Sequence, residues 1–448
     1  MKIKKLARTS ALTVTTLAAA LLAAPADAIE LYNQDGNELH FDGLAIFGAF
    51  HSRRNYDTFG IGQTKGSSSW REGFTNYGLT GTRMVGSGAA IHGRISLLTS
   101  GTWGDGDPAG LTTGSERRTK VEDAYLGWRS GNLFPALGED GVDFSFGRQN
   151  FVIGDGFLIN GDALNLGRGI DREFSRGGAY WLAARKAFDQ TAVLRLGGGE
   201  GLRSDIFWLK SDNKVQADTE LAGVNVEYVT EEGTFAAMYI KGLDVDQELA
   251  QIFGRTNRDG QKTWSLRFQG NAGVENLFLS AEYVHQDQGD SSMRDADAWY
   301  LEGGWTFADA PWSPGVAYRY TRYDRDFDPL FFGFNRGYGT WFQGEVAGNF
   351  AGPFGSDAKI HHLRLNANPL ENLTVGVNYF HFPSARVFGQ DAAARELDIY
   401  AEWAVHDHLI ISPLVGFYKP RKSAAEGGTQ IGSDKTNTYA HLLFIVPF

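Results

Sequence analysis

Apolar and polar residues alternate along most of the chain after residue 28. In residues 91–97 the odd positions are apolar or small and the even positions are polar, and residues 264–269 and 398–403 repeat this pattern. A period of two is the signature of β-strands whose two faces meet different surroundings. The pattern therefore predicts an all-β protein.

The polar face of these strands carries arginine and glutamate in strand after strand. A soluble β-sandwich alternates in the same way, but about eighteen such charged faces could not all reach solvent on one compact domain without a second layer. A transmembrane barrel accommodates them, because its lipid-facing side is apolar and its interior is polar. The sequence thus favours a transmembrane antiparallel up-and-down β-barrel.

Nineteen segments fit the strand pattern, which is an odd number. Both ends of a bacterial barrel should lie on the periplasmic side, so the number of strands should be even and we predict about eighteen. The weakest segment is 192–198, which adjoins a glycine-rich stretch. The nineteen segments are 39–53, 74–84, 89–99, 119–129, 142–150, 178–188, 192–198, 202–212, 221–230, 233–243, 262–272, 277–286, 299–307, 315–324, 359–368, 373–382, 396–406, 409–418 and 437–448.

Connections of two kinds alternate between these segments. Short ones such as 368–372 and 406–408 are typical of periplasmic turns, and the long polar ones are typical of extracellular loops. The long connections are 56–71, 101–116, 244–259, 327–358 and 419–435. No linker or shift in composition marks a second domain, so residues 29–448 are expected to form one barrel.

One long connection contains alternating carboxylates at Asp324, Asp326 and Asp328. Such spacing suits a calcium loop, but an EF-hand needs glycine at its sixth position, where this chain has Pro329. We therefore predict a solvated loop here.

The first 28 residues have the features of a secretory signal peptide. An apolar stretch over residues 11–24 is followed by Ala26-Asp27-Ala28, whose small residues suit signal peptidase. The apolar stretch is too short for a stop-transfer helix. The basic residues that precede it are Lys2, Lys4, Lys5 and Arg8.

Composition and charge exclude several classes of function. The chain has no cysteine, so it has neither a disulfide framework nor a thiolate metal site. Loss of the signal peptide would change the formal net charge from −11 to −14, which argues against nucleic-acid binding. The 57 glycines and 13 % aromatic residues suit an outer-membrane barrel, and no cofactor is expected.

The chain ends in a strand pattern that closes on an aromatic residue. Leu442, Phe444, Val446 and Phe448 share one face. This resembles the C-terminal signature of outer-membrane proteins. The resemblance implies recognition by the barrel-assembly machinery, with outer-membrane lipids and lipopolysaccharide as the surrounding partners in the bacterial outer membrane.

Period two also assigns charged side chains to the lumen. If Ile91, Ile95 and Leu266 meet lipid, their polar neighbours face inward, since an arginine on the lipid face costs about 2–4 kcal/mol at mid-membrane. These residues either hold the wall together by ion pairs or create a transverse field that selects solutes. The predicted lumen residues are Arg94, Arg129, Arg195, Arg267, Arg319, Arg364, Glu227, Glu302 and Glu402.

The segment after Gln149 is long and glycine-rich, yet contains Phe151, Phe157 and Leu158. An exposed loop has little use for such apolar residues, so we expect residues 151–176 to fold into the barrel and narrow it. The alternative is a surface loop packed on its own side chains.

Around this segment the chain contains the short motifs Gly147-Arg148-Gln149-Asn150, Gly154-Asp155-Gly156 and Gly161-Asp162, followed by Arg172. With these motifs the chain resembles the alginate-export family of outer-membrane porins. The resemblance implies an eighteen-stranded monomeric barrel with an arginine-rich constriction for an anionic polyuronate, in which Arg148, Arg168, Arg172 and Arg176 would select anions. The predicted inward-facing carboxylates differ from what strict transport of a polyanion would need.

These observations predict a passive outer-membrane channel for polar, anionic solutes rather than an enzyme, because no G-x-S-x-G nucleophile elbow is present. Two alternatives remain open: a general or catabolic uptake porin, and a non-conducting structural or adhesive barrel.

Overall fold

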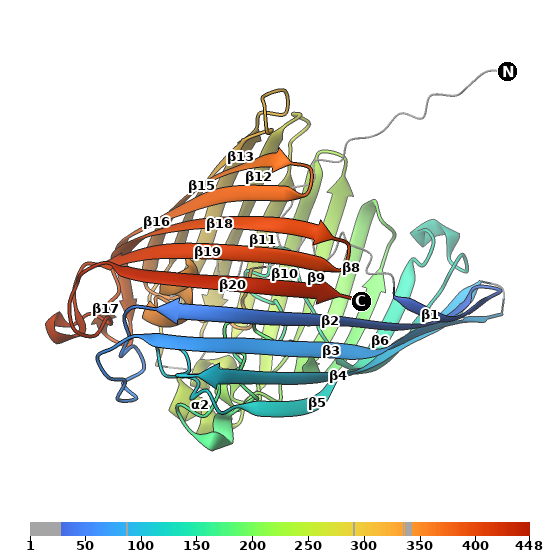
Figure 1. Ribbon diagram of the computed structural model, residues 1–448. Helices are drawn as coiled ribbons and strands as arrows, with labels where there is room; N and C mark the ends of the chain where they lie inside the picture. The colour runs from blue at the N-terminus through green and yellow to red at the C-terminus, as the bar shows by residue number, and fades with distance from the viewer. Residues whose placement is uncertain (1–27, 87, 290–291, 335, 337–342) are drawn as a thin grey trace.

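The computed structural model describes residues 28–448, apart from 87, 290–291, 335 and 337–342. Its twenty strands form one sheet in which neighbouring strands are antiparallel. Eighteen of them close into a barrel, because β20 pairs with β2 from Leu44 to Ser52, as the red and blue strands of Figure 1 show. The predicted eighteen-stranded barrel is confirmed. The predicted signal peptide falls mostly on residues 1–27, outside the described residues.

The barrel strands are long on the β2–β4 side and shorter around β6–β8. Two further strands, β1 and β17, extend the barrel locally. The strands are β1 Ile29–Gln34, β2 Asn37–Ser52, β3 Ser68–Val85, β4 Ala89–Gly104, β5 Arg117–Arg129, β6 Val142–Gln149, β7 Phe188–Leu196, β8 Gly201–Lys210, β9 Glu220–Thr230, β10 Gly233–Asp244, β11 Lys262–Gly270, β12 Leu277–Asp287, β13 Ala296–Thr306, β14 Gly315–Tyr323, β15 Ala358–Leu370, β16 Leu373–Val387, β17 Gln390–Asp391, β18 Ala394–His406, β19 Leu409–Pro420 and β20 Asn437–Pro447.

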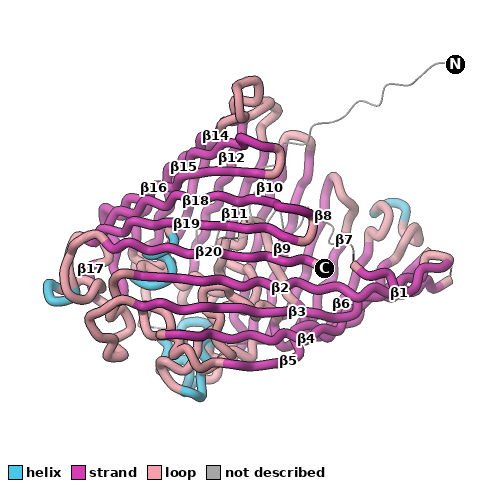
Figure 2. Tube along the Cα trace, in the orientation of Figure 1, coloured by secondary structure: helices cyan, strands magenta, loops and turns pink. Residues whose placement is uncertain are grey.

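Helices are short and lie in the connections (Figure 2). None of those in the described part of the chain is long and apolar enough to cross a membrane. They are η1 Pro135–Leu137, η2 Arg172–Phe174, η3 Lys214–Gln216, α2 Gln247–Phe253, η4 Thr256–Arg258, η5 Ala347–Ala351 and η6 Ala424–Glu426.

The alternation of apolar and polar residues along each strand places apolar side chains on the outer face of the barrel wall and polar side chains on the inner face. On β11, the side chain of Leu266 is 64 % exposed on the outer face, whereas Ser265 and Arg267 are buried on the inner face. A one-residue slip would exchange these faces, so the cost of placing charge in lipid sets the register.

One predicted strand is absent. Residues 178–187 continue the long connection between β6 and β7, while the segment judged weakest, 192–198, largely coincides with β7. The reason is local, because Gly178, Ala179 and Ala183 have positive φ values of 74°, 54° and 46°. Such left-handed residues interrupt a strand ladder, so the chain turns inward before β7 begins at Phe188.

The two ends of the barrel differ as the loop lengths predict. The two-residue turns 231–232, 371–372 and 407–408 lie at one end, and the long connections gather at the other (Figures 1 and 2). The C-terminus lies at the short-turn end, where Gly43 exchanges two backbone hydrogen bonds with Phe448. Gly43 also makes room for the terminal ring, since a Cβ there would lie 2.4 Å from atoms of Phe448.

Candidate functional site

The connection between β6 and β7, residues 150–187, crosses the barrel interior. At one side Asp155 accepts hydrogen bonds from Ser280 of β12 at 3.0 Å and from Tyr300 of β13 at 2.8 Å. At the other side the Trp181 ring lies 4.7 Å from that of His441 on β20. Six strand-to-strand steps separate β13 from β20 around the barrel, so the segment spans part of the interior, which confirms that it folds inward. We call residues 150–187 the first inward loop.

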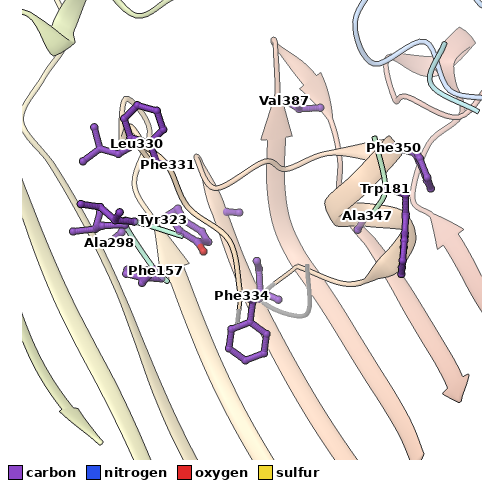
Figure 3. Close-up of a cluster of buried hydrophobic side chains, with 14 of the residues drawn as sticks. Phe157, Trp181, Ala298, Tyr323, Leu330, Phe331, Phe334, Ala347, Phe350 and Val387 are labelled. Carbon is purple, nitrogen blue, oxygen red and sulfur yellow. The ribbon is translucent and has the colours of Figure 1, made fainter. Parts of the chain in front are cut away.

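Apolar packing holds this loop in place. The Phe157 ring is buried against Tyr300 and Tyr323, with ring centroids 5.1 and 5.6 Å apart. Ile159 forms a parallel bridge with Phe331, which belongs to the connection between β14 and β15. Figure 3 shows Phe157, Tyr323 and Phe331 among the side chains of this buried cluster. A hydrophobic core thus lies inside the barrel.

The described residues of the connection between β14 and β15, which are 324–357 apart from 335 and 337–342, also fold inward and are called the second inward loop. Its Glu345 accepts a hydrogen bond from Trp181 Nε1 at 3.0 Å. The backbone N–H groups of Val346 and Ala347 donate to Glu396 of β18 at 2.6 and 2.9 Å. The two loops therefore contact each other as well as the wall. Sequence periodicity gave no sign that this connection would enter the lumen.

Three arginines surround Glu302 of β13 on the lumen wall. Arg319 of β14 is its directly paired neighbour and lies 3.5 Å away, and Arg364 of β15 lies 3.9 Å away. Arg336 of the second inward loop reaches Glu302 at 2.6 Å and Asp155 at 2.7 Å. Three guanidinium groups thus share two carboxylates. We call these five residues the Glu302 cluster.

The Glu302 cluster is also packed against aromatic rings. The Arg336 guanidinium lies 4.8 Å from the ring centroid of Phe278 and 5.0 Å from that of Phe334. Burial lowers the pKa of Arg336, but Asp155 and Glu302 raise it well above its usual value. Burial raises the pKa of Asp155, yet Arg336 holds it below its usual value. Both loop residues therefore remain charged at neutral pH.

A second group of ion pairs lies on the lumen face of β8, β9 and β11. Glu227 of β9 pairs with Arg267 of β11 and accepts from Arg203 Nε of β8 at 2.6 Å. The Arg203 side chain is 43 % exposed. Arg203 was not among the predicted residues, although its place opposite Leu202 in the alternation marks it as lumen-facing.

Neither a protein-family model nor a curated protein sequence matches the chain significantly, but solved structures do match. A BenF-like porin from Pseudomonas fluorescens Pf-5 aligns with a TM-score of 0.58 and 10 % identity over 92 % of this chain and 98 % of that one. The fold is that of an outer-membrane porin. Acinetobacter baumannii OccAB4 aligns at 0.55 with 12 % identity, and Pseudomonas aeruginosa OccK5 (OpdH) at 0.54 with 11 %, each over 91 % of this chain and 98 % of the other.

Three predicted lumen arginines near the short-turn end of this porin fold each have a carboxylate partner. Arg94 pairs with Asp42 and lies 3.1 Å from Asp123. Two more peripheral pairs are Arg195 with Asp205 at 3.6 Å and Arg129 with Asp140 at 3.7 Å. These arginines bring little net charge to this end of the lumen.

Two of the four arginines named by the family resemblance come together. Arg148 reaches Asp212 at 3.0 Å, and Arg176 reaches it at 2.9 Å and Asp162 at 3.4 Å. Burial raises the pKa of Asp212, but Arg176, Arg148 and Arg185 lower it below its usual value. This cluster ties the first inward loop to the connection after β8.

The other two arginines lie apart from that cluster. Arg168 donates from its backbone to Glu116 at 2.9 Å and from its guanidinium to Ser115 at 3.4 Å. Arg172 is exposed in η2, between Asp171 and Glu173. The four arginines therefore do not form one constriction, because Arg148 of β6 and Arg176 meet at Asp212 while Arg168 and Arg172 have other surroundings.

The β18 wall is acidic rather than basic. Asp398 and Glu396 are fully buried there, and Glu402 is partly buried nearer the turn end. Glu345 of the second inward loop lies close to this wall through its neighbours Val346 and Ala347. Carboxylates thus gather on β18, a few strands from the arginines of β14 and β15.

The expectation of a solvated loop at residues 324–328 is wrong for Asp328. Its side chain is buried and pairs with Arg258 at 2.7 Å and Arg255 at 3.3 Å. The connection after β10 supplies both arginines and docks on the second inward loop. Among the described residues, no three histidine, aspartate or glutamate side chains are placed to hold a metal ion.

Proposed function

We propose that the protein is an outer-membrane channel for passive diffusion of polar solutes, with a modest preference for anions. The fold supports the channel. The observation that carries the preference is the Glu302 cluster, in which the guanidinium groups of Arg319, Arg336 and Arg364 gather around the carboxylates of Glu302 and Asp155. Within this cluster three arginines face two carboxylates in a narrowed part of the lumen.

The preference is modest because most lumen arginines already have partners. In a confined, partly desolvated passage an unbalanced charge acts more strongly on a passing ion than it does in bulk water. The acidic residues of the β18 wall oppose it, so the net effect is a bias and not exclusion of cations.

Arginine suits carboxylate solutes, since its planar fork binds two oxygens at once. A polyuronate, as the alginate-export resemblance implies, is one such solute. General or catabolic uptake fits the same lumen equally well, because a passive channel follows the gradient.

One observation favours the second candidate, a non-conducting structural or adhesive barrel. The two inward loops build a hydrophobic core within the lumen, with Phe157, Phe331 and Phe350 all buried. Apolar side chains that fill a barrel obstruct the path of ions.

Planar-bilayer recording of the refolded full chain separates the two candidates. The proposed channel produces discrete conductance steps after insertion. Insertion verified by a heat-dependent gel shift, without any steps, would contradict the channel and favour the adhesive barrel.

A further inference from the structure

The inward loops enclose a cavity of about 1600 Å³ inside the barrel. Porin interiors are polar and ligand pockets are commonly roughly 300–1,000 Å³, so a large and mainly apolar cavity is unusual in this place. Its apolar lining comes from β2, β3 and several connections. Among the lining residues are Leu44, Phe74, Leu164, Leu182, Phe253 and Phe334.

A lysine of the first inward loop, Lys186, lines this cavity. Its backbone is fixed on both sides, since its N–H donates to Glu122 at 2.7 Å and its carbonyl accepts from the Asp162 amide at 2.8 Å. The side chain is partly buried. Its ammonium forms no ion pair with any carboxylate of the described residues.

Two carboxylates of β5 that also line the cavity, Glu122 and Asp123, already have cationic partners. Glu122 accepts from Arg185 Nε at 3.2 Å in addition to two backbone amides. Asp123 pairs with Arg94 and accepts from Ser96 at 2.6 Å. Burial lowers the pKa of Lys186, while Glu122 opposes this shift. An ammonium that no carboxylate pairs with directly is costly in a mainly apolar cavity, and a ligand anion would relieve that cost.

We propose that this cavity binds an amphipathic monocarboxylate, with the carboxylate paired to Lys186 and the apolar body among the surrounding aliphatic and aromatic side chains. The proposal rests on the proposed channel function and deepens it by naming a class of solute. Charge complementarity selects the carboxylate, and the lining selects an apolar body over a hydroxyl-rich one. Either an aromatic or an alicyclic acid has this chemistry.

Binding to the refolded, detergent-solubilised full chain is measured by isothermal titration calorimetry. The probes are 2-naphthoate for an aromatic acid, cyclohexanecarboxylate for an alicyclic one, 2-naphthalenemethanol for a neutral analogue, and acetate for a small polar anion. We expect saturable binding of at least one of the two apolar acids and much weaker binding of acetate and the alcohol. The acid that binds more tightly shows whether the cavity prefers an aromatic or an alicyclic solute.

The variant Lys186→Met keeps most of the length of the unbranched side chain and removes its charge. It should weaken acid binding at least tenfold without changing the binding of the alcohol, and Lys186→Arg should restore most of the acid affinity. Lys435→Met, at an exposed lysine of the connection before β20, is the matched control and should bind as the parent does.

Equal affinity of the parent and Lys186→Met for 2-naphthoate and cyclohexanecarboxylate would overturn the proposal, as would acetate binding as tightly as those acids. Conductance reports separately on the channel. A conducting barrel that binds neither acid overturns this site alone, whereas a non-conducting barrel that binds one supports the site and contradicts the channel.

Discussion

Arg336 of the second inward loop donates to Glu302 of β13 at 2.6 Å. The same guanidinium reaches Asp155 of the first inward loop at 2.7 Å. One side chain thus joins both loops to the lumen wall. Its removal would break the ion pairs that link three parts of the molecule at once.

Arg336→Met is therefore expected to destabilise the barrel by about 3–5 kcal/mol, because removing one member of a buried pair leaves the other charges uncompensated. The free energy of unfolding is measured by urea denaturation in lipid vesicles, followed by tryptophan fluorescence. Asp434→Asn breaks the exposed pair with Lys419 and should leave the unfolding midpoint unchanged. Equal midpoints for parent and Arg336→Met would show that the pair does not anchor the loops.

Phe157→Ala is expected to cost about 3–5 kcal/mol, since a fully buried phenylalanine leaves a cavity when truncated. The same urea measurement applies. Phe307, whose side chain is 50 % exposed at a short turn, is the matched position, and Phe307→Ala should cost much less. Similar costs at both positions would contradict a packed core inside the barrel.

Stability should depend on pH through Asp328. Burial raises the pKa of Asp328, but Arg258 and Arg255 lower it to a value far below the ordinary one. A depressed pKa in the folded state adds stability that is fully present above the unfolded value, about 3.9, and is lost as pH falls toward the folded pKa. The parent should therefore exceed Asp328→Asn in unfolding free energy at pH 7.

That difference should shrink steadily once the pH falls below about 4. Unfolding midpoints of the parent and Asp328→Asn are compared from pH 7 to pH 3. A difference that stays constant over this range would mean that Arg258 does not stabilise the ionised Asp328 carboxylate in the folded protein.

Period two in the sequence was enough to predict the barrel and the side of the wall on which a residue lies. Leu266 outside and Arg267 inside follow from the cost of charge in lipid, which acts on each strand separately. The inward course of the first loop was also predictable, because Phe157 and Leu158 need burial.

Longer-range features were not predictable in this way. The second inward loop has no periodic signal, and its Arg336 finds Glu302 only through the folded course of the chain. The extra predicted strand at 178–188 has strand-like residues, but left-handed residues at Ala179 and Ala183 break it. Arg148 and Arg176 meet at Asp212, whose role no local motif indicates.

The reversal potential under a tenfold KCl gradient tests the central claim most directly. The parent channel should be mildly anion-selective, and Arg319→Gln combined with Arg364→Gln should move its reversal potential toward cation selectivity. Lys419→Gln, at an exposed lysine near the long-connection end of β19, should leave it unchanged. A strongly cation-selective parent, or a double variant with the parent's reversal potential, would contradict the account.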